Sequence, residues 1–319
     1  MSNFTITIVG TGLIGTSLGL ALKQIKDPIT VLGHDRDLAN AKAGVKLGAF
    51  DKAEWNLVNA CEKADLILLA IPLNGIRPTL EAIARDLKEN VVISDTCPTK
   101  APVLAWAKEL LPEHAHFVGG NPVVQAAESG HSHASAELFR GRLYCLTPDP
   151  AASEEAVQLM TGVVGQLGAE PFFVDAAEHD GLMTAVEHLP ALLSITVVNM
   201  LSGQQAWRET RKLAGGLFQQ VSAGATGDPD GLAESFSAQR ENLNRWLTMY
   251  IDRLTQVQTL LNQDETEALT ELIDHSVVER TNWLTDYEQG SFRDPELTPP
   301  EVERRGLMQQ MFGFGRKRK

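Results

Sequence analysis

The sequence is poor in cysteine and in positive charge, and it has no long uninterrupted hydrophobic run. Three cysteines in 319 residues are too few and too scattered for a disulfide framework or a zinc site. A formal net charge of −13 and a pI near 5.1 argue against nucleic acid or an anionic membrane as a general partner. The longest apolar stretch, residues 182–201, is interrupted by Glu187, His188 and Pro190, so we expect no membrane span.

The start of the sequence shows no targeting signal. MSNFTITIVG enters an apolar run directly, with no basic leader and no cleavage pattern. The content of 43% hydrophobic and 22% charged residues is that of an ordinary soluble globular protein. Together these observations lead us to expect a cytoplasmic protein. Because 319 residues exceed what one hydrophobic core usually supports, we also expect two domains.

A glycine-rich segment near the start is the most informative part of the sequence. Phe4–Val9 is a short apolar run rich in β-branched residues, which is typical of a buried parallel strand. Gly10, Gly12 and Gly15 follow with G-x-G-x-x-G spacing, which provides a tight turn, a close backbone approach to pyrophosphate and close helix–strand packing. A helix from Leu13 would direct its first amide groups and its dipole toward the phosphates.

An acidic residue completes the dinucleotide pattern. Residues 29–33 predict a second strand, and Asp35 follows it, 20 residues after Gly15. A carboxylate there can accept hydrogen bonds from the ribose 2′-hydroxyl, which favours NAD. Arg36 could stack on adenine or pair with a 2′-phosphate, so NADP stays open. A glycine triplet alone also occurs in ordinary strand–helix turns, but the strand, the helix and the acid together predict a dinucleotide site.

Strand and helix signals alternate through the first half of the chain. Further strands are predicted at 65–71, 91–95, 117–118, 143–146 and 171–174, and helices at 38–47, 76–87, 99–111 and 152–167. This alternation predicts an α/β fold with a doubly wound, mostly parallel Rossmann-type sheet, whose ligands bind beyond the carboxyl ends of the strands. The candidate cofactor contacts at that edge are Gly10, Thr11, Gly12, Leu13, Ile14, Gly15, Asp35, Arg36, Ala70, Ile71, Pro72 and Asp95.

The second half of the chain carries only helical signals. Residues 178–201 predict a long apolar helix kinked at Pro190, and residues 268–283 predict another helix. Between them an apolar seam repeats at spacings of three and four: Leu243, Leu247, Tyr250, Leu254, Val257 and Leu261. The seam could close an intrachain bundle or pack against a second subunit. We therefore predict a dinucleotide-binding domain at 1–175, a helical substrate and dimerisation domain at 176–290, and a mobile tail with four terminal basic residues at 291–319.

Several segments together resemble the prephenate/arogenate dehydrogenase family of tyrosine biosynthesis. The segments are VGTGLIGTSLGLAL near the start, DLILLAIP at 65–72, ELFRGRLYCLTP at 137–148, EHDGLMTAVEHLPALL at 178–193 and LAGGLF at 213–218. Their order and spacing carry a resemblance that spans most of residues 5–265. It implies a dinucleotide domain with NAD or NADP, a helical domain that commonly forms homodimers, and oxidative decarboxylation of prephenate or arogenate.

The substrate positions depart from the family pattern. The family's G-G-H-P segment, whose histidine hydrogen-bonds the reacting hydroxyl, reads Gly-Gly-Asn-Pro here, with Asn121 in place of the histidine. An amide can orient a hydroxyl but cannot take up a proton near neutral pH, and general-base catalysis typically contributes roughly 10²–10⁴ in rate. Two family arginines, one of which grips the substrate's ring carboxylate, fall at Gln219 and Ala223. Arg208 and Arg211 lie upstream and could substitute for them.

Two more family patterns are only partly kept. In D-x-x-S-x-K, Asp95 and Lys100 match while Pro98 takes the serine position. HLPH reads HLPA, which keeps His188 and loses the second histidine at Ala191. The resemblance places His188 where the helical domain meets the cofactor cleft, so it is the best surviving acid–base candidate.

The candidate catalytic residues are His188, Asn121 and Lys100. Asn121 is expected to line the pocket, and Lys100 either binds an anionic substrate or is a solvated lysine at a helix start. His131 and His133 occupy a polar loop and could supply the missing base or simply be solvated, whereas His179 is assigned to structure at the domain junction.

Three functions remain compatible with the sequence. The first is a dehydrogenase of the family with an altered site, and the second is a related oxidoreductase acting on another small substrate such as a hydroxy acid. The third is a non-catalytic dinucleotide-binding protein. The breadth of the resemblance favours an NAD(P)-dependent dehydrogenase of this family.

Overall fold

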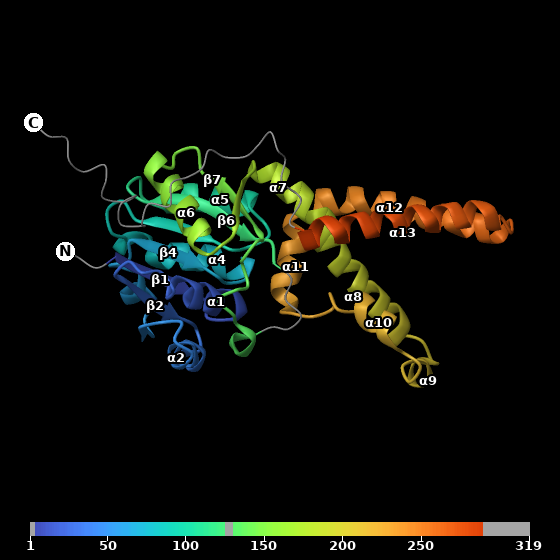
Figure 1. Ribbon diagram of the computed structural model, residues 1–319, viewed down its shortest axis with the longest axis horizontal. Coiled ribbons are helices and arrows are strands. Elements are labelled where there is room, and N and C mark those ends of the chain that lie inside the picture. The colour runs from blue at the N-terminus through green and yellow to red at the C-terminus, as the bar shows by residue number, and fades with distance from the viewer. Residues whose placement is uncertain (1–3, 125–129, 290–319) are drawn as a thin grey trace, which may run out of the picture. The chain divides into compact units, whose positions relative to one another are not determined.

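The computed structural model describes residues 4–124 and 130–289 (Figure 1). They form two compact units. Of the described residues, the first comprises those up to Asp180 and Ala233–Ala238, and the second comprises Gly181–Leu232 and Gln239–Gln289. The tail predicted at 291–319, with its basic terminus, lies outside the described residues.

The first unit is built on an eight-stranded sheet with the order β3-β2-β1-β4-β5-β6-β7-β8. The strands are β1 (Phe4–Val9), β2 (Ile29–His34), β3 (Lys52–Ala53), β4 (Leu66–Leu69), β5 (Val92–Asp95), β6 (His116–Pro122), β7 (Leu143–Pro148) and β8 (Glu170–Phe173). Neighbouring strands are parallel except for the antiparallel pair β6–β7. The predicted α/β, doubly wound Rossmann-type fold is confirmed, and its strand order reverses between β1 and β4.

Helices cover both faces of this sheet (Figure 1). They are α1 (Leu13–Leu22), α2 (Leu38–Lys46), α3 (Leu57–Cys61), α4 (Leu73–Ile83), α5 (Ala101–Leu110) and α6 (Glu154–Gln166), with short 3₁₀ turns η1 (Ala84–Asp86) and η2 (His131–His133). Leu66 and Leu68 of β4 belong to one hydrophobic core with α1 and α6, whereas Ile67 and Leu69 belong to a second core with α4 and α5. Because alternate side chains of β4 are buried on opposite faces, its sequence is continuously apolar.

Two elements of the first unit were not predicted, and one strand is longer than expected. The two-residue strand β3 and the five-residue helix α3 are too short to produce a periodic pattern. Strand β6 extends through Gly119 and Gly120, residues that usually weaken a strand. A Cβ at Gly119 would lie 2.2 Å from Thr147 Oγ1, and one at Gly120 would lie 2.6 Å from the Asp95 carbonyl oxygen. Close packing against β7 and β5 therefore requires both glycines.

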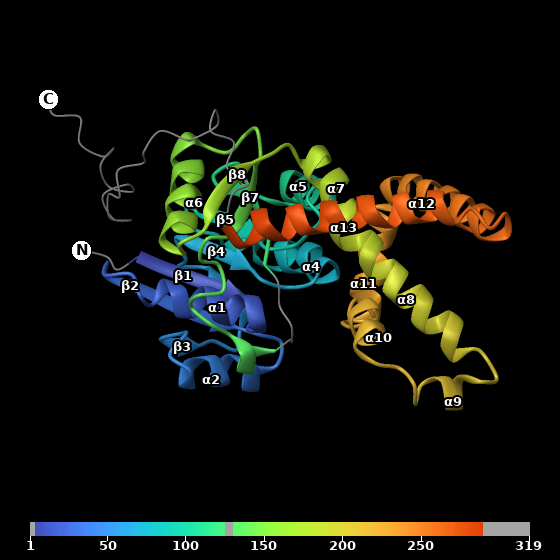
Figure 2. The ribbon, with the colours of Figure 1, turned by 45° about the vertical axis from the view of Figure 1, so that its right-hand side comes forward.

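From Ala176 onward every secondary-structure element that the structure describes is a helix or a helical turn, as predicted. The elements are α7 (Ala176–Met183), the π-helical turn η3 (Thr184–His188), α8 (Leu189–Ser202), α9 (Trp207–Thr210), α10 (Gly216–Val221), α11 (Pro229–Ala238), α12 (Arg240–Asn262) and α13 (Thr266–Gln289). The sequence predicts a kink at Pro190, and the structure has a π turn just before that residue, where the Leu189 N–H donates to the Thr184 carbonyl. Helices α12 and α13 pack along each other (Figure 2).

One helical stretch is apolar over a length that could cross a membrane. It is Ala176–Ser202, with a mean hydropathy of 1.5 in its most apolar window, and core helices of soluble proteins pass the same test. Leu182, Val186 and Met200 on this stretch are each more than half exposed. The absence of a membrane span therefore stays a prediction.

Candidate active site

The turn between β1 and α1 has the geometry that a dinucleotide requires. Gly10 has a φ of 91°, and a Cβ there would lie 2.3 Å from the Ala70 carbonyl oxygen. A Cβ at Gly15 would lie 1.8 Å from the Gly10 carbonyl oxygen, whereas one at Gly12 would have no neighbour within 4 Å. Gly12 is the N-cap of α1 and supplies no side-chain hydrogen bond. The first amides of α1 therefore lie at an open, side-chain-free position suited to a pyrophosphate.

Asp35 is fixed to this turn through Thr11. Its Oδ2 accepts hydrogen bonds from the Thr11 backbone N–H (2.8 Å) and hydroxyl (3.0 Å), and its Oδ1 accepts one from the Asp37 N–H (2.9 Å). Burial tends to raise the pKa of Asp35, but these hydrogen bonds, led by the Thr11 N–H, outweigh it and hold the pKa below its usual value. The carboxylate is therefore ionised near neutral pH, and Arg36 beside it is exposed.

The segment after β4 completes the predicted cofactor edge. Ala70 donates its N–H to the Val9 carbonyl at 2.7 Å, which continues the pairing of β4 with β1. Ala70 and Ile71 are half-buried beside Gly10, and Pro72 is exposed as the N-cap of α4. The structure thus gathers the glycine turn, Asp35 and residues 70–72 at the carboxyl end of the sheet.

Asp95 and Lys100 form a buried ion pair next to this edge. The Lys100 ammonium donates to the Asp95 carboxylate and to the Gly120 carbonyl at 2.8 Å. Asp95 also accepts from the Cys97 N–H at 3.0 Å and the Gly120 N–H at 3.1 Å. Both side chains are 0% exposed, so the expectation of a solvated lysine is wrong. A buried charge is costly unless it is paired, and here each charge has its partner. Through Gly120 the same contacts join β5 to β6.

A second set of contacts joins Asn121, at the end of β6, to the start of α7. Asn121 Nδ2 lies 3.1 Å from His179 Nε2, and His179 Nδ1 lies 3.1 Å from Asp180 Oδ1. Asp180 also accepts from the Lys100 N–H at 2.6 Å and the Ala101 N–H at 3.0 Å, so it caps the N-terminus of α5. Asn121, His179 and Asp180 are each at most 3% exposed.

The sequence did not identify His179 and Asp180 as partners of Asn121. They are adjacent in the segment EHDG, and a carboxylate beside a histidine is a usable signal. Pairing them with Asn121 requires the topology that brings the end of β6 to α7, 58 residues later in the chain. Tyr144 lies against Gly120 in the same region, where burial above all, and also the charge of Asp95, raises the pKa of its hydroxyl. Tyr144 is therefore a neutral group.

The other substrate-side candidates belong to other helices and turns of the chain. His188 is the last residue of the π turn η3 and is 3% exposed. In the second unit Gln219, Ala223, Arg208 and Arg211 are exposed, and neither arginine forms an ion pair within the part of the chain that the structure describes. His131 and His133 form η2, which contacts α1 in the first unit.

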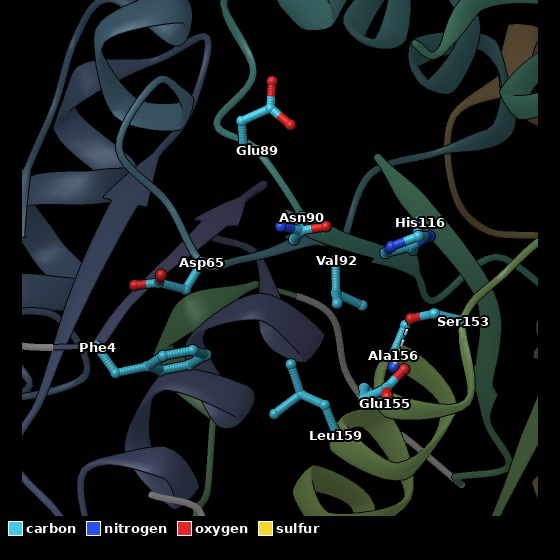
Figure 3. Close-up of a pocket in the computed structure, with 10 residues that line it drawn as sticks. All are labelled: Phe4, Asp65, Glu89, Asn90, Val92, His116, Ser153, Glu155, Ala156 and Leu159. Carbon is cyan, nitrogen blue, oxygen red and sulfur yellow. Dashed lines mark hydrogen bonds between the residues drawn. The ribbon is translucent and has the colours of Figure 1, made fainter. Parts of the chain in front are cut away.

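A hollow of about 600 Å³ lies at the opposite, amino-terminal edge of the sheet (Figure 3). It is lined by Phe4, Asp65, Glu89, Asn90, Val92, His116, Ser153, Glu155, Ala156 and Leu159. The Asp65 carboxylate accepts from the Thr5 N–H and from Lys88, and Ser153 caps α6. No group of three or more potential metal ligands occurs among the described residues.

The strand order, the open glycine turn at the point where that order reverses, and the ionised carboxylate after β2 define the class. The chain has a dinucleotide-binding unit of the Rossmann type, followed by a helical unit. Residues 18–172 match the family described as "Prephenate dehydrogenase, nucleotide-binding domain", and residues 175–275 match "Prephenate dehydrogenase, dimerization domain". The chain belongs to the prephenate dehydrogenase family, as the resemblance implied.

Individual relatives agree with this assignment. The chain is 25% identical over 267 residues to prephenate dehydrogenase of Bacillus subtilis, covering 83% of this chain and 72% of that one. It is 26% identical over 285 residues to cyclohexadienyl dehydrogenase of Zymomonas mobilis, covering 89% and 97%. Among solved structures, Synechocystis arogenate dehydrogenase matches with a TM-score of 0.70 and 25% identity over 88% of this chain and 100% of that one.

The same fold occurs in Aquifex aeolicus prephenate dehydrogenase, solved with hydroxyphenyl propionate and NAD⁺. That match has a TM-score of 0.81 and 22% identity over 88% of this chain and 99% of the other. The family match for the nucleotide-binding domain begins at residue 18, after the glycine turn. The assignment of the turn therefore stands on its own geometry.

Proposed function

We propose that this chain is a cytoplasmic, homodimeric dehydrogenase that uses NAD to decarboxylate prephenate or arogenate oxidatively. The names of its relatives supply the substrates. The observation that carries the proposal is the pairing of an open dinucleotide turn with a buried, oriented amide, Asn121, at the same carboxyl edge of the sheet. The homodimer would form through the helical unit, which matches a dimerization domain.

The residues of the β1–α1 turn fit the cofactor. Gly10 to Gly15 would hold the pyrophosphate at the start of α1, with Ala70, Ile71 and Pro72 lining the turn. Asp35 would accept hydrogen bonds from the ribose 2′-hydroxyl. NAD is favoured over NADP because a 2′-phosphate would face the ionised carboxylate that Thr11 holds in place. When bound, the nicotinamide supplies an acceptor for hydride.

The balance of the reaction explains how an amide can replace a histidine. Hydride leaves the carbinol carbon, the bond from the ring to its carboxylate breaks, and carbon dioxide departs. The electron pair of that bond makes the ring aromatic, and the hydroxyl keeps its proton in the phenol product. Because no net proton is released, the group that meets the hydroxyl needs only to accept a hydrogen bond, which an amide oxygen does.

The other candidate residues have separate roles in this proposal. Lys100 and Asp95 act as positioning residues, since their ion pair holds Gly120, the residue before Asn121. His188 is assigned as a polar group that contacts the substrate. Its place at the end of a π turn supports this, since such turns are frequent at functional sites.

A second candidate function is oxidation of another small hydroxy acid. The neutral side chains at Gln219 and Ala223 favour it, because neither can form the bidentate, charge-assisted contact that an arginine makes with a carboxylate. A substrate with fewer carboxylates would not need that contact.

The test is a steady-state assay with NAD or NADP and prephenate, arogenate or a panel of hydroxy acids, read as absorbance of the reduced cofactor. We expect turnover of prephenate or arogenate with NAD, and a kcat about tenfold lower in Asn121→Ala, which removes the acceptor. His188→Ala should also lower kcat, whereas the exposed control His275→Ala should not. Cofactor binding without turnover of any substrate would identify a non-catalytic homologue, and turnover of hydroxy acids alone would support the second candidate.

A further inference from the structure

Asn121, His179 and Asp180 form a chain of hydrogen bonds. In this chain the partner of each atom determines whether that atom donates or accepts. At its inner end Asp180 accepts two backbone N–H groups from the start of α5, at 2.6 and 3.0 Å. The same carboxylate lies 3.1 Å from His179 Nδ1. Because Asp180 acts as the acceptor at each of these contacts, His179 Nδ1 is the donor and carries the proton.

This proton determines the orientation of the asparagine. A neutral imidazole that is protonated at Nδ1 has a lone pair at Nε2 and can only accept there. Asn121 must then turn its Nδ2 toward His179 Nε2, which lies 3.1 Å away. The amide oxygen Oδ1 is left on the other side. The Asn121 side chain makes no other hydrogen bond within the described residues, so Oδ1 can accept one from a ligand.

We propose that Asp180 and His179 are positioning residues that fix the amide of Asn121 with Oδ1 presented to the substrate hydroxyl. The site therefore offers a hydrogen-bond acceptor where the family has an imidazole, and it selects a substrate that can donate at that point. The proposed function supplies the identity of the hydroxyl, whereas the orientation of the amide stands on the contacts alone.

Two substitutions of His179 separate its two hydrogen bonds: the one that Nε2 accepts from Asn121 and the one that Nδ1 donates to Asp180. In His179→Gln the amide oxygen can replace Nε2 and still accept from Asn121. In His179→Asn the shorter amide can replace Nδ1 and donate to Asp180, but nothing reaches Asn121. Both variants remove the ring, so they lose similar packing and differ in which hydrogen bond they keep.

The functional readout is binding of two probes in the presence of NAD, hydroxyphenyl propionate and phenylpropionate, which lacks the hydroxyl. We expect the wild type and His179→Gln to prefer the hydroxylated probe about tenfold, the effect of one hydrogen bond. His179→Asn should lose that preference while its affinity for NAD stays unchanged. With substrate, His179→Asn should lower kcat/KM about tenfold, whereas His179→Gln should keep most of it. A preference kept in His179→Asn, or lost equally in both variants, would overturn the proposal.

The second readout needs neither probe nor turnover. Long-range ¹H–¹⁵N spectra of the wild-type histidines, assigned with His179→Gln, should show His179 protonated at Nδ1. A nitrogen–nitrogen coupling across the hydrogen bond should connect Asn121 Nδ2 to His179 Nε2. A proton on Nε2 would reverse the amide and overturn the proposal. The expected tautomer in a protein that turns over no prephenate or arogenate would instead contradict only the proposed function.

Discussion

The Lys100 ammonium donates to the Asp95 carboxylate inside the first unit, where both side chains are 0% exposed. Removing one partner leaves the other as a buried, unpaired charge. We expect Lys100→Met to lower the free energy of unfolding by about 3–5 kcal/mol.

The double variant Lys100→Met, Asp95→Asn should recover part of this loss, because it leaves no unpaired charge. Chemical denaturation of the two proteins measures both effects. Lys108→Ala, at an exposed position of α5, is the control and should unfold like the wild type. A single variant as stable as the wild type would show that the pair is dispensable.

The glycines of the turn should separate cofactor binding from folding. A Cβ at Gly12 meets nothing within 4 Å, so Gly12→Ala should fold with unchanged or slightly raised stability and lose affinity for NAD, because the methyl group occupies the approach to the pyrophosphate. A Cβ at Gly15 would lie 1.8 Å from the Gly10 carbonyl oxygen, so Gly15→Ala should lose both stability and binding. Thermal denaturation and NAD titration measure the two properties, and equal NAD affinity in Gly12→Ala and wild type would contradict the assigned site.

Cofactor preference should depend on the charge at position 35. Asp35→Asn removes the charge that opposes a 2′-phosphate, and it weakens the hydrogen bond to a 2′-hydroxyl. We expect the ratio of NAD to NADP affinity to fall about tenfold or more, since hydrogen bonds to charged groups are the stronger ones. Fluorescence titration with both cofactors gives the ratio. Asp37→Asn is the matched control because asparagine is also a good N-cap for α2, and it should leave the ratio unchanged.

The stability of the first unit should respond to acid through Asp35. Burial acts to raise its pKa, but the Thr11 N–H and the other hydrogen bonds outweigh it and hold the folded-state pKa below the usual value for an aspartate. A lowered folded-state pKa stabilises the fold above the unfolded-state value, and this contribution disappears as the pH falls through the folded-state value. The stability advantage of wild type over Asp35→Asn should therefore be complete at neutral pH and shrink below about pH 4. Urea denaturation of both proteins across that range measures it, and a constant difference would contradict the assignment.

Exposed apolar side chains on α12 should be needed for assembly. Ile251 and Leu254 are 58% and 52% exposed, and the helical unit matches a dimerization domain. We expect Leu254→Glu to shift the protein from dimer to monomer in light scattering at equal concentration, because a buried unpaired charge is costly. Asn244→Glu, at an exposed polar position of the same helix, should remain dimeric. A monomeric wild type would contradict the prediction that these side chains form a dimer interface.

The architecture was predictable where burial imposes a period on the sequence. Strand β1 was predicted with its observed bounds, Phe4–Val9, because its residues are apolar or β-branched and all but Thr5 are buried. Strand β6 was predicted at two residues and spans seven. Its glycines are required by close packing against the neighbouring strands, and this requirement produces no periodic pattern in the sequence. In the apolar seam only Leu243 is fully buried, while Leu254 and Leu261 are more than half exposed. A period of 3.6 residues shows that a helix has an apolar face but not what covers it.

The candidate site divides in the same way. The residues predicted to contact the cofactor are close in sequence or follow consecutive strands, so spacing and topology can predict them. Lys100 shows the limit of this reasoning, since its position at the start of a helix suggested solvent or an anion and its actual partner is Asp95. His179 was beyond sequence reasoning because its contact with Asn121 joins residues 58 positions apart.

The hydrogen-bond chain from Asp180 to Asn121 bears on how this protein can evolve. A histidine at position 121 could also donate from one ring nitrogen to His179 Nε2 and present the lone pair of its other nitrogen. The same histidine–aspartate pair can therefore orient either residue. An exchange of histidine for asparagine at position 121 needs no second change in its support. It replaces a group that can take up a proton by one that can only accept a hydrogen bond.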